Sequence, residues 1–144
     1  MNRLFDFKDR DVADPNDYPT PQWLFDQLDD EFHFTVDVAA SKNNAKCDRY
    51  YTRDDDGLSH NWTGVVWMNP PYSPWTELAR WVQKAFQSAR DGATVVCLLP
   101  VRADTNWWHD YAIKGEVRWI RQRLNFGGTG RPSFASCIVI FRPA

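Results

Sequence analysis

The stretch of sequence best suited to chemistry is Asn-Pro-Pro-Tyr at positions 69 to 72, directly after the apolar run "GVVWM". Both prolines lack a backbone N–H, and Pro70 disfavours the helical region for Asn69. Such a stiff corner presents acceptors without nearby backbone donors. The Asn69 side-chain oxygen and the Pro70 carbonyl are therefore candidates to accept both hydrogens of an amine, such as the exocyclic amine of a nucleobase. Tyr72 offers a flat face on which a base could stack.

Local patterns place this corner between a strand and a helix. The apolar residues 64–68 predict a buried strand. Ser73 can cap the helix that follows, and Pro74 suits its first position. Apolar residues then recur at helical spacing from position 75 to position 89, until Gly92 ends the pattern. A second continuously apolar strand, "ATVVCLLP", comes next.

The remaining elements flank this central unit. Upstream, Thr20 and Pro21 predict the start of a helix in "PTPQWLFDQLDDEF", and residues 32–38 predict a strand that runs into a tight loop. The short "RYYT" could form a brief strand. Downstream, we expect a short helix ending at Gly115, a half-exposed strand in "EVRWIRQRLNF" and a last apolar strand in "ASCIVIFR".

Alternation of strands and helices with continuously apolar central strands predicts a small three-layer α/β domain. Its sheet should be mostly parallel, with the last two strands forming an antiparallel C-terminal edge. In such sheets, ligands bind outside the carboxyl ends of the strands. The loops expected to carry function follow Val38, Met68 and Leu99.

Length and composition favour one domain. The chain has 144 residues, 43% of them hydrophobic, so it can bury a core. We expect residues 1–15 to form a flexible arm and residues 16–144 a single domain. The start lacks a secretion signal, and no apolar stretch approaches the length of a membrane span, which indicates a cytoplasmic protein without membrane contact. Three scattered cysteines predict free thiols and no metal site.

The charge is distributed unevenly along the chain. The formal net charge is -2, yet residues 116–144 contain five arginines and one carboxylate. This segment is basic enough to meet a polyanion, although arginines on a solvated strand would look the same. The candidate phosphate-binding residues are Arg118, Arg121, Arg123 and Arg131.

With these motifs the chain resembles the S-adenosylmethionine-dependent amino-methyltransferases that modify adenine in DNA, whose signature is Asp/Asn-Pro-Pro-Tyr. The segments "TPQWLF", "DVAAS", "DGL", "NPPY", "LLPVRADTNWW" and "PSFASCIVIF" occur in the order of the compact phage and prophage group. The resemblance implies a Rossmann-like methyltransferase fold of reduced size. It departs from the larger family in two ways. "DVAAS" replaces a glycine-rich loop, and we expect no separate target-recognition domain. A homodimer could supply the missing recognition surface.

The resemblance also implies a cofactor site. Thr20 would help hold the methionine part of S-adenosyl-L-methionine, and Asp37 and Ala39 belong to the cofactor loop. Asp56 would accept from the adenine amine of the cofactor. The ribose-binding acid stays open between Asp48 and Asp54.

The implied function is methyl transfer to the N6 amine of a flipped adenine in DNA. The resemblance also implies that the protein is encoded by a phage or prophage and acts in the cytoplasm of the bacterial host. The catalytic group would be Asn69, Pro70, Pro71 and Tyr72. Three alternatives stand beside it. They are methylation of glutamine N5 in a protein, methylation of cytosine N4, disfavoured because Asn69 stands where that group has Ser, and a catalytically inactive nucleic-acid-binding module.

Overall fold

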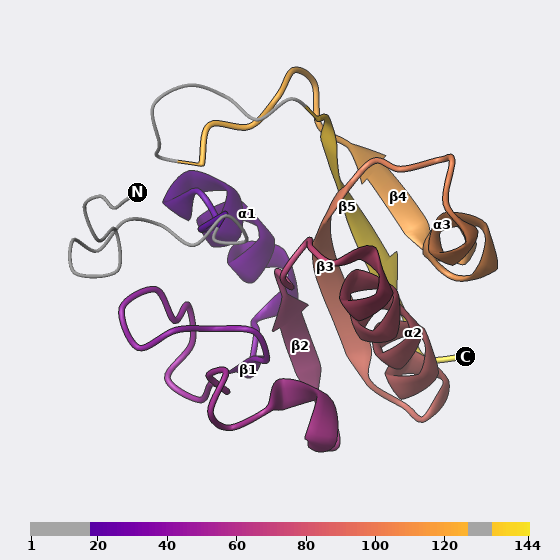
Figure 1. Cartoon of the computed structure of the whole chain (residues 1–144). Helices are drawn as coiled ribbons and strands as arrows, with labels where there is room; N and C mark the ends of the chain where they lie inside the picture. The colour runs from indigo at the N-terminus through magenta and orange to yellow at the C-terminus, as the bar shows by residue number, and fades with distance from the viewer. Residues whose placement is uncertain (1–17, 127–133) are drawn as a thin grey trace, which may run out of the picture.

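In the computed structural model, which describes residues 18–126 and 134–144, five strands form one sheet with the order β1-β2-β3-β5-β4 (Figure 1). The strands are β1 (Val36–Asp37), β2 (Val65–Met68), β3 (Thr94–Pro100), β4 (Glu116–Trp119) and β5 (Ser136–Phe141). The expected arm, residues 1–15, lies outside the described residues, as does Arg131.

The pairing confirms a parallel sheet with an antiparallel end. β1 pairs with β2 and β2 with β3 in parallel, whereas β5 runs antiparallel to both β3 and β4. The C-terminal strand therefore lies inside the sheet, and β4 forms the edge. Burial explains this order, because every residue of β5 is buried, whereas the residues of β4 are only half-buried or exposed.

Helices cover both faces of the sheet, as the three-layer prediction requires. Helix α1 (Gln22–Phe32) packs on one face, and α2 (Trp75–Arg90) and α3 (Asn106–Asp110) pack on the other (Figure 1). β3 serves both layers through its alternating side chains. Val95, Cys97 and Leu99 belong to the core under α2, whereas Val96 and Leu98 belong to the core under α1.

Both long helices begin one residue later than predicted. Pro21 and Pro74 occupy the N-cap positions rather than the first helical positions, and neither caps through its side chain. The Thr20 hydroxyl, expected to cap α1, instead accepts a hydrogen bond from the Asn69 side chain. A contact between distant segments thus replaces a local cap.

The first predicted strand is much shorter than expected. Phe32 ends α1, His33 follows in the left-handed conformation, and only Val36–Asp37 pair as a strand. The predicted brief strand at "RYYT" appears as a single parallel bridge between Asp37 and Tyr50. Within the described ranges, no helix is both long and apolar enough to cross a membrane.

Candidate active site

A cavity of about 540 Å³ lies at the carboxyl ends of β1 and β2, the edge of the sheet where the sequence predicts a ligand. Its wall combines four segments. These are residues 18–20 before α1, the loop after β1, residues 51–57, and the corner after β2 together with two side chains of α2. Thr20, Asp37, Ala39, Asp56, Asn69 and Pro71, all predicted site residues, line it.

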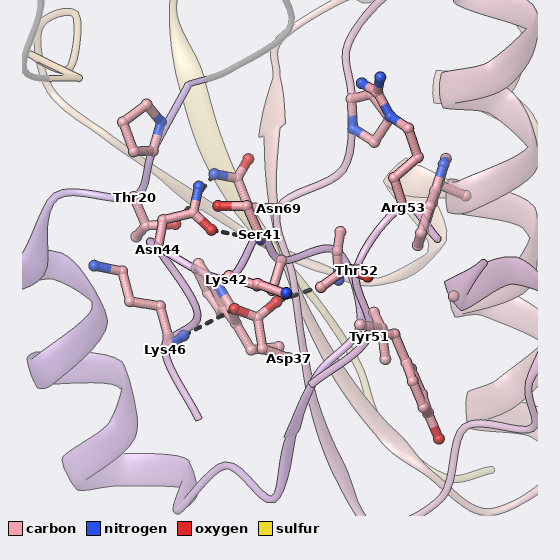
Figure 2. Close-up of a pocket in the computed structure, with 18 of the residues that line it drawn as sticks. Thr20, Asp37, Ser41, Lys42, Asn44, Lys46, Tyr51, Thr52, Arg53 and Asn69 are labelled. Atoms are coloured by element: carbon pink, nitrogen blue, oxygen red, sulfur yellow. Dashed lines mark hydrogen bonds between the residues drawn. The ribbon is translucent and has the colours of Figure 1, made fainter. Parts of the chain in front are cut away.

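Asn69 is half-buried in this wall, and every polar atom of its side chain has a partner. Its amide nitrogen donates to the Tyr18 carbonyl at 2.6 Å and contacts the Thr20 hydroxyl at 3.1 Å. Its amide oxygen accepts from the Tyr72 hydroxyl at 3.0 Å. Figure 2 shows the Thr20 and Asn69 side chains turned toward each other. Since a carbonyl can only accept, the Tyr18 contact determines which end of the amide faces it.

Tyr72 is buried, with only 8% of its surface exposed. Burial raises the pKa of its hydroxyl well above the ordinary value, so it stays protonated. That hydroxyl lies 3.0 Å from both the Asn69 amide oxygen and the Leu98 carbonyl. The Tyr18 ring stacks on the Tyr72 ring, with centroids 5.2 Å apart and planes 20° apart. Tyr18 thus covers one face of the Tyr72 ring.

Tyr18 belongs to an aromatic cluster that sequence reasoning missed. It makes edge contacts with Phe126 at 5.2 Å and Phe134 at 5.3 Å, and Phe134 also contacts Tyr72. These four rings come from chain segments far apart in sequence. The only local signal was an aromatic residue shortly before Thr20, in "YPTP". The two prolines of the corner differ as well, because Pro71 lines the cavity and Pro70 is buried.

Asp37 holds the loop after β1. Its carboxylate accepts from the backbone N–H of Ala39 at 3.2 Å and from that of Lys46 at 3.0 Å (Figure 2). Burial raises the pKa of this carboxyl, and the two hydrogen bonds oppose the rise. Because the Ala39 N–H is already bonded to Asp37, the aspartate acts on the loop rather than directly on a ligand at this point.

The three aspartates at positions 54 to 56 have different surroundings. Asp54 and Asp56 line the cavity. Asp55 instead accepts from the backbone and hydroxyl of Thr52, which lower the pKa of its carboxyl. Of the two candidates for a ribose-binding acid, Asp54 lies on the wall and Asp48 does not.

Three cations also line the cavity, and the sequence did not single them out. They are Lys42, Lys46 and Arg53, all labelled in Figure 2. Lys46 donates to Gln22 at 2.7 Å. The opposite part of the wall is apolar and aromatic, because Trp81 of α2 is buried there against Gly57. The Trp81 indole N–H is buried without a hydrogen-bond partner.

The three predicted phosphate-binding arginines within the described residues, Arg118, Arg121 and Arg123, differ in their surroundings. Arg118 makes a two-pronged ion pair with Glu31 at 2.7 and 2.8 Å and bonds Glu116 at 2.7 Å. Glu116 also pairs with Arg142. The hydrogen bond from Arg118 lowers the pKa of both glutamates. The charge of Arg118 is thus matched within the protein, whereas Arg121 and Arg123 are exposed in the segment after β4.

The cysteines are unsuited to nucleophilic chemistry. All three are free, and burial raises the pKa of Cys47 and of Cys137 to about 12. Burial likewise keeps the Cys97 pKa well above its ordinary value. Over residues 18–126 and 134–144, no three His, Cys, Asp or Glu side chains are grouped as metal ligands. The side chains on the cavity wall offer hydrogen bonds, charges and aromatic faces.

The sequence is also similar to known proteins. The sequence is 33% identical over 99 residues to a protein of Haemophilus phage HP1 named DNA N-6-adenine-methyltransferase, covering 67% of this chain and 56% of the relative. It is 27% identical over 130 residues to a protein of the same name in Escherichia phage T1, covering 83% of this chain and 53% of the relative. The chain thus spans about half the length of the curated relatives it matches. Residues 9–140 match the family described as DNA N-6-adenine-methyltransferase (Dam), and the chain belongs to that family.

Proposed function

We propose that this chain transfers a methyl group from S-adenosyl-L-methionine to the N6 amine of adenine in DNA. The observation that carries the proposal is the Asn69 side chain. In a member of the Dam family, it stands at the carboxyl end of β2, on the wall of the 540 Å³ cavity, with its amide orientation set by its neighbours. Membership of a methyltransferase family implies a methyl donor.

The cavity suits such a donor in size and in the chemistry of its wall. Its volume of about 540 Å³ lies within the usual range for small-molecule sites. Asp56 would accept from the adenine amine, Asp54 would bind the ribose hydroxyls, and Trp81 would cover the adenine ring. Lys42 would pair with the methionine carboxylate, a role that chemical complementarity favours. When bound, the cofactor supplies an electrophilic methyl group on its sulfonium.

The residues of the corner prepare the amine. The lone pair of an adenine amine is delocalised into the ring, which makes the nitrogen a poor nucleophile. If the Asn69 oxygen and the Pro70 carbonyl accept the two N–H groups, the nitrogen becomes more tetrahedral and its lone pair is freed for in-line attack. This help is electrostatic and orientational. It calls for no covalent enzyme intermediate, in keeping with the raised pKa of the Cys47 and Cys137 thiols.

The base must also reach the corner. In a duplex the amine is paired, so adenine would be extruded before transfer. To stack on Tyr72 it would replace Tyr18, whose ring now occupies that face. Arg121 and Arg123, together with Arg131 outside the described residues, would bind phosphates in the DNA of a bacterial host. The matched charge of Arg118 argues against including it.

The test is to incubate the protein with methyl-labelled S-adenosyl-L-methionine and unmethylated DNA, then digest the DNA to nucleosides. We expect label in N6-methyladenine from the wild type, at least about a hundredfold less from Asn69→Ala, and unchanged label from Asn61→Ala, which alters an exposed asparagine away from the cavity. Label in cytosine or only in protein glutamine would replace the proposed substrate. No label together with no cofactor binding would indicate an inactive module.

A further inference from the structure

The segment before α1 controls the side chain of Asn69. Tyr18 and Thr20 lie 51 and 49 residues earlier in the chain, yet both contact the Asn69 amide nitrogen. Thr20 lies one residue before Pro21, the N-cap of α1. Here it makes no cap, and only 6% of its surface is exposed. Its hydroxyl therefore accepts a hydrogen bond from Asn69 at a buried position, where few water molecules can compete for that bond.

We propose that Thr20 and the main chain of Tyr18 are positioning groups for Asn69. An asparagine amide can rotate so that its nitrogen and oxygen exchange places, and the two orientations have opposite hydrogen-bonding character. The Tyr18 carbonyl at 2.6 Å accepts only, so it holds the nitrogen on its side. Thr20 provides a second acceptor at 3.1 Å. The amide oxygen is thereby left to face Tyr72 and the target.

This inference rests on the proposed function, because the held oxygen is the one that would accept from the amine. The Tyr72 hydroxyl shares its one hydrogen between that oxygen and the Leu98 carbonyl, each 3.0 Å away, and a carbonyl-type oxygen has a second lone pair for one more donor. If the amide were reversed, its NH₂ group would face the amine of the base, donor against donor. Holding the orientation therefore acts on the rate of transfer rather than on cofactor affinity.

The first test compares two substitutions of Thr20. Thr20→Val removes the acceptor with little change of shape, whereas Thr20→Ser keeps it. We expect kcat to fall about fivefold in Thr20→Val, the value of one neutral hydrogen bond, with the KM for S-adenosyl-L-methionine unchanged. Thr20→Ser should retain most of the wild-type kcat. Thermal unfolding of both variants separates this effect from a loss of folding.

Three outcomes would overturn the inference. The first is a rise in cofactor KM at unchanged kcat, which would make Thr20 a cofactor ligand. The second is an equal loss of kcat in Thr20→Ser, and the third is an unchanged kcat in Thr20→Val.

An NMR readout is independent of turnover. The side-chain amide protons of Asn69 should exchange with water more slowly in the wild type and Thr20→Ser than in Thr20→Val. A wild type that methylates no DNA would refute the proposed function. Equal exchange in all three proteins would refute the positioning of Asn69 by Thr20.

Asn69→Asp tests the contact between the Asn69 amide nitrogen and the Tyr18 carbonyl. An aspartate keeps an oxygen for the target amine but places a second oxygen 2.6 Å from the Tyr18 carbonyl, with no hydrogen between them. We expect kcat to fall by at least about tenfold, because two acceptors face each other in a half-buried position. Wild-type kcat in Asn69→Asp would show that the amide nitrogen has no role.

Discussion

At the scale of single residues, Asp37 is a buried acidic residue at the end of β1, where the following loop begins. Only 3% of its surface is exposed, and two backbone N–H groups are its hydrogen-bond donors. Burial outweighs these bonds, so the pKa of the folded carboxyl lies above its ordinary value of 3.8. The folded protein consequently binds a proton at Asp37 more readily than the unfolded chain does.

This sign leads to a pH prediction. The contribution of Asp37 to stability is fully present below about pH 3.8, falls as pH rises through the raised folded pKa, and is constant above it. The free energy of unfolding of the wild type, minus that of Asp37→Asn, should therefore decrease with rising pH. Urea denaturation of both proteins from about pH 3 to pH 7 measures the difference. Asp48→Asn, at an exposed position, is the control, and a difference that rises with pH would contradict the prediction.

At the scale of elements, the cavity depends on how closely a short 3-10 turn, Gly57–Ser59, approaches the end of β1. A Cβ atom added to Gly57 would lie 2.2 Å from the Val38 carbonyl oxygen and 3.0 Å from the Trp81 ring. The Trp62 indole also donates to the Gly57 carbonyl at 2.9 Å. A glycine is required here because of space, since the neighbouring atom is backbone and cannot rotate away.

We expect Gly57→Ala to lower the free energy of unfolding by about 2 kcal/mol or more and to weaken cofactor binding, because the turn must move away from Val38. Gly92→Ala is the matched control. Its added Cβ meets nothing within 4 Å, and only its positive φ of 117° opposes the substitution. It should cost about 1–3 kcal/mol and leave cofactor affinity unchanged. Urea denaturation and calorimetric titration with S-adenosyl-L-methionine measure the two effects, and intact binding by Gly57→Ala would contradict the account.

At the scale of the whole molecule, the basic C-terminal part divides into matched and exposed charges. Arg118 joins β4 to the end of α1 through Glu31, and Glu116 links it to Arg142. These ion pairs lie at the surface, so their effect on stability is small. Arg121 and Arg123 follow β4 in an exposed segment. Position and pairing, rather than the number of arginines, decide which can meet a phosphate.

DNA binding should therefore respond differently to these arginines. We expect Arg121→Ala and Arg123→Ala each to weaken binding and to reduce the slope of log K against log salt by about 0.9, the value of one phosphate contact. Arg118→Ala should leave the slope unchanged and slightly lower the melting temperature. Fluorescence anisotropy over a salt series measures the slopes. A reduced slope in Arg118→Ala alone would reverse this assignment.

Much of the framework follows from local sequence, because short-range patterns decide it. The apolar spacing of α2 and the continuous apolar runs of β2 and β3 predict buried elements, and parallel pairing then brings Asn69 to the ligand-binding edge. The stiffness of the corner is likewise written in its two prolines. For these features sequence alone was sufficient, as it was for the family to which the chain belongs.

Tertiary structure decided the partners of each functional side chain. Thr20 bonds Asn69 instead of capping α1, Tyr18 covers Tyr72, and Arg118 pairs with Glu31, 87 residues away. These contacts arise when burial of both faces of the sheet brings distant segments together, and no local propensity encodes such proximity. Sequence determined that an asparagine stands at a rigid corner on the ligand edge. Only the packed fold determined which of its two amide atoms is turned toward the site.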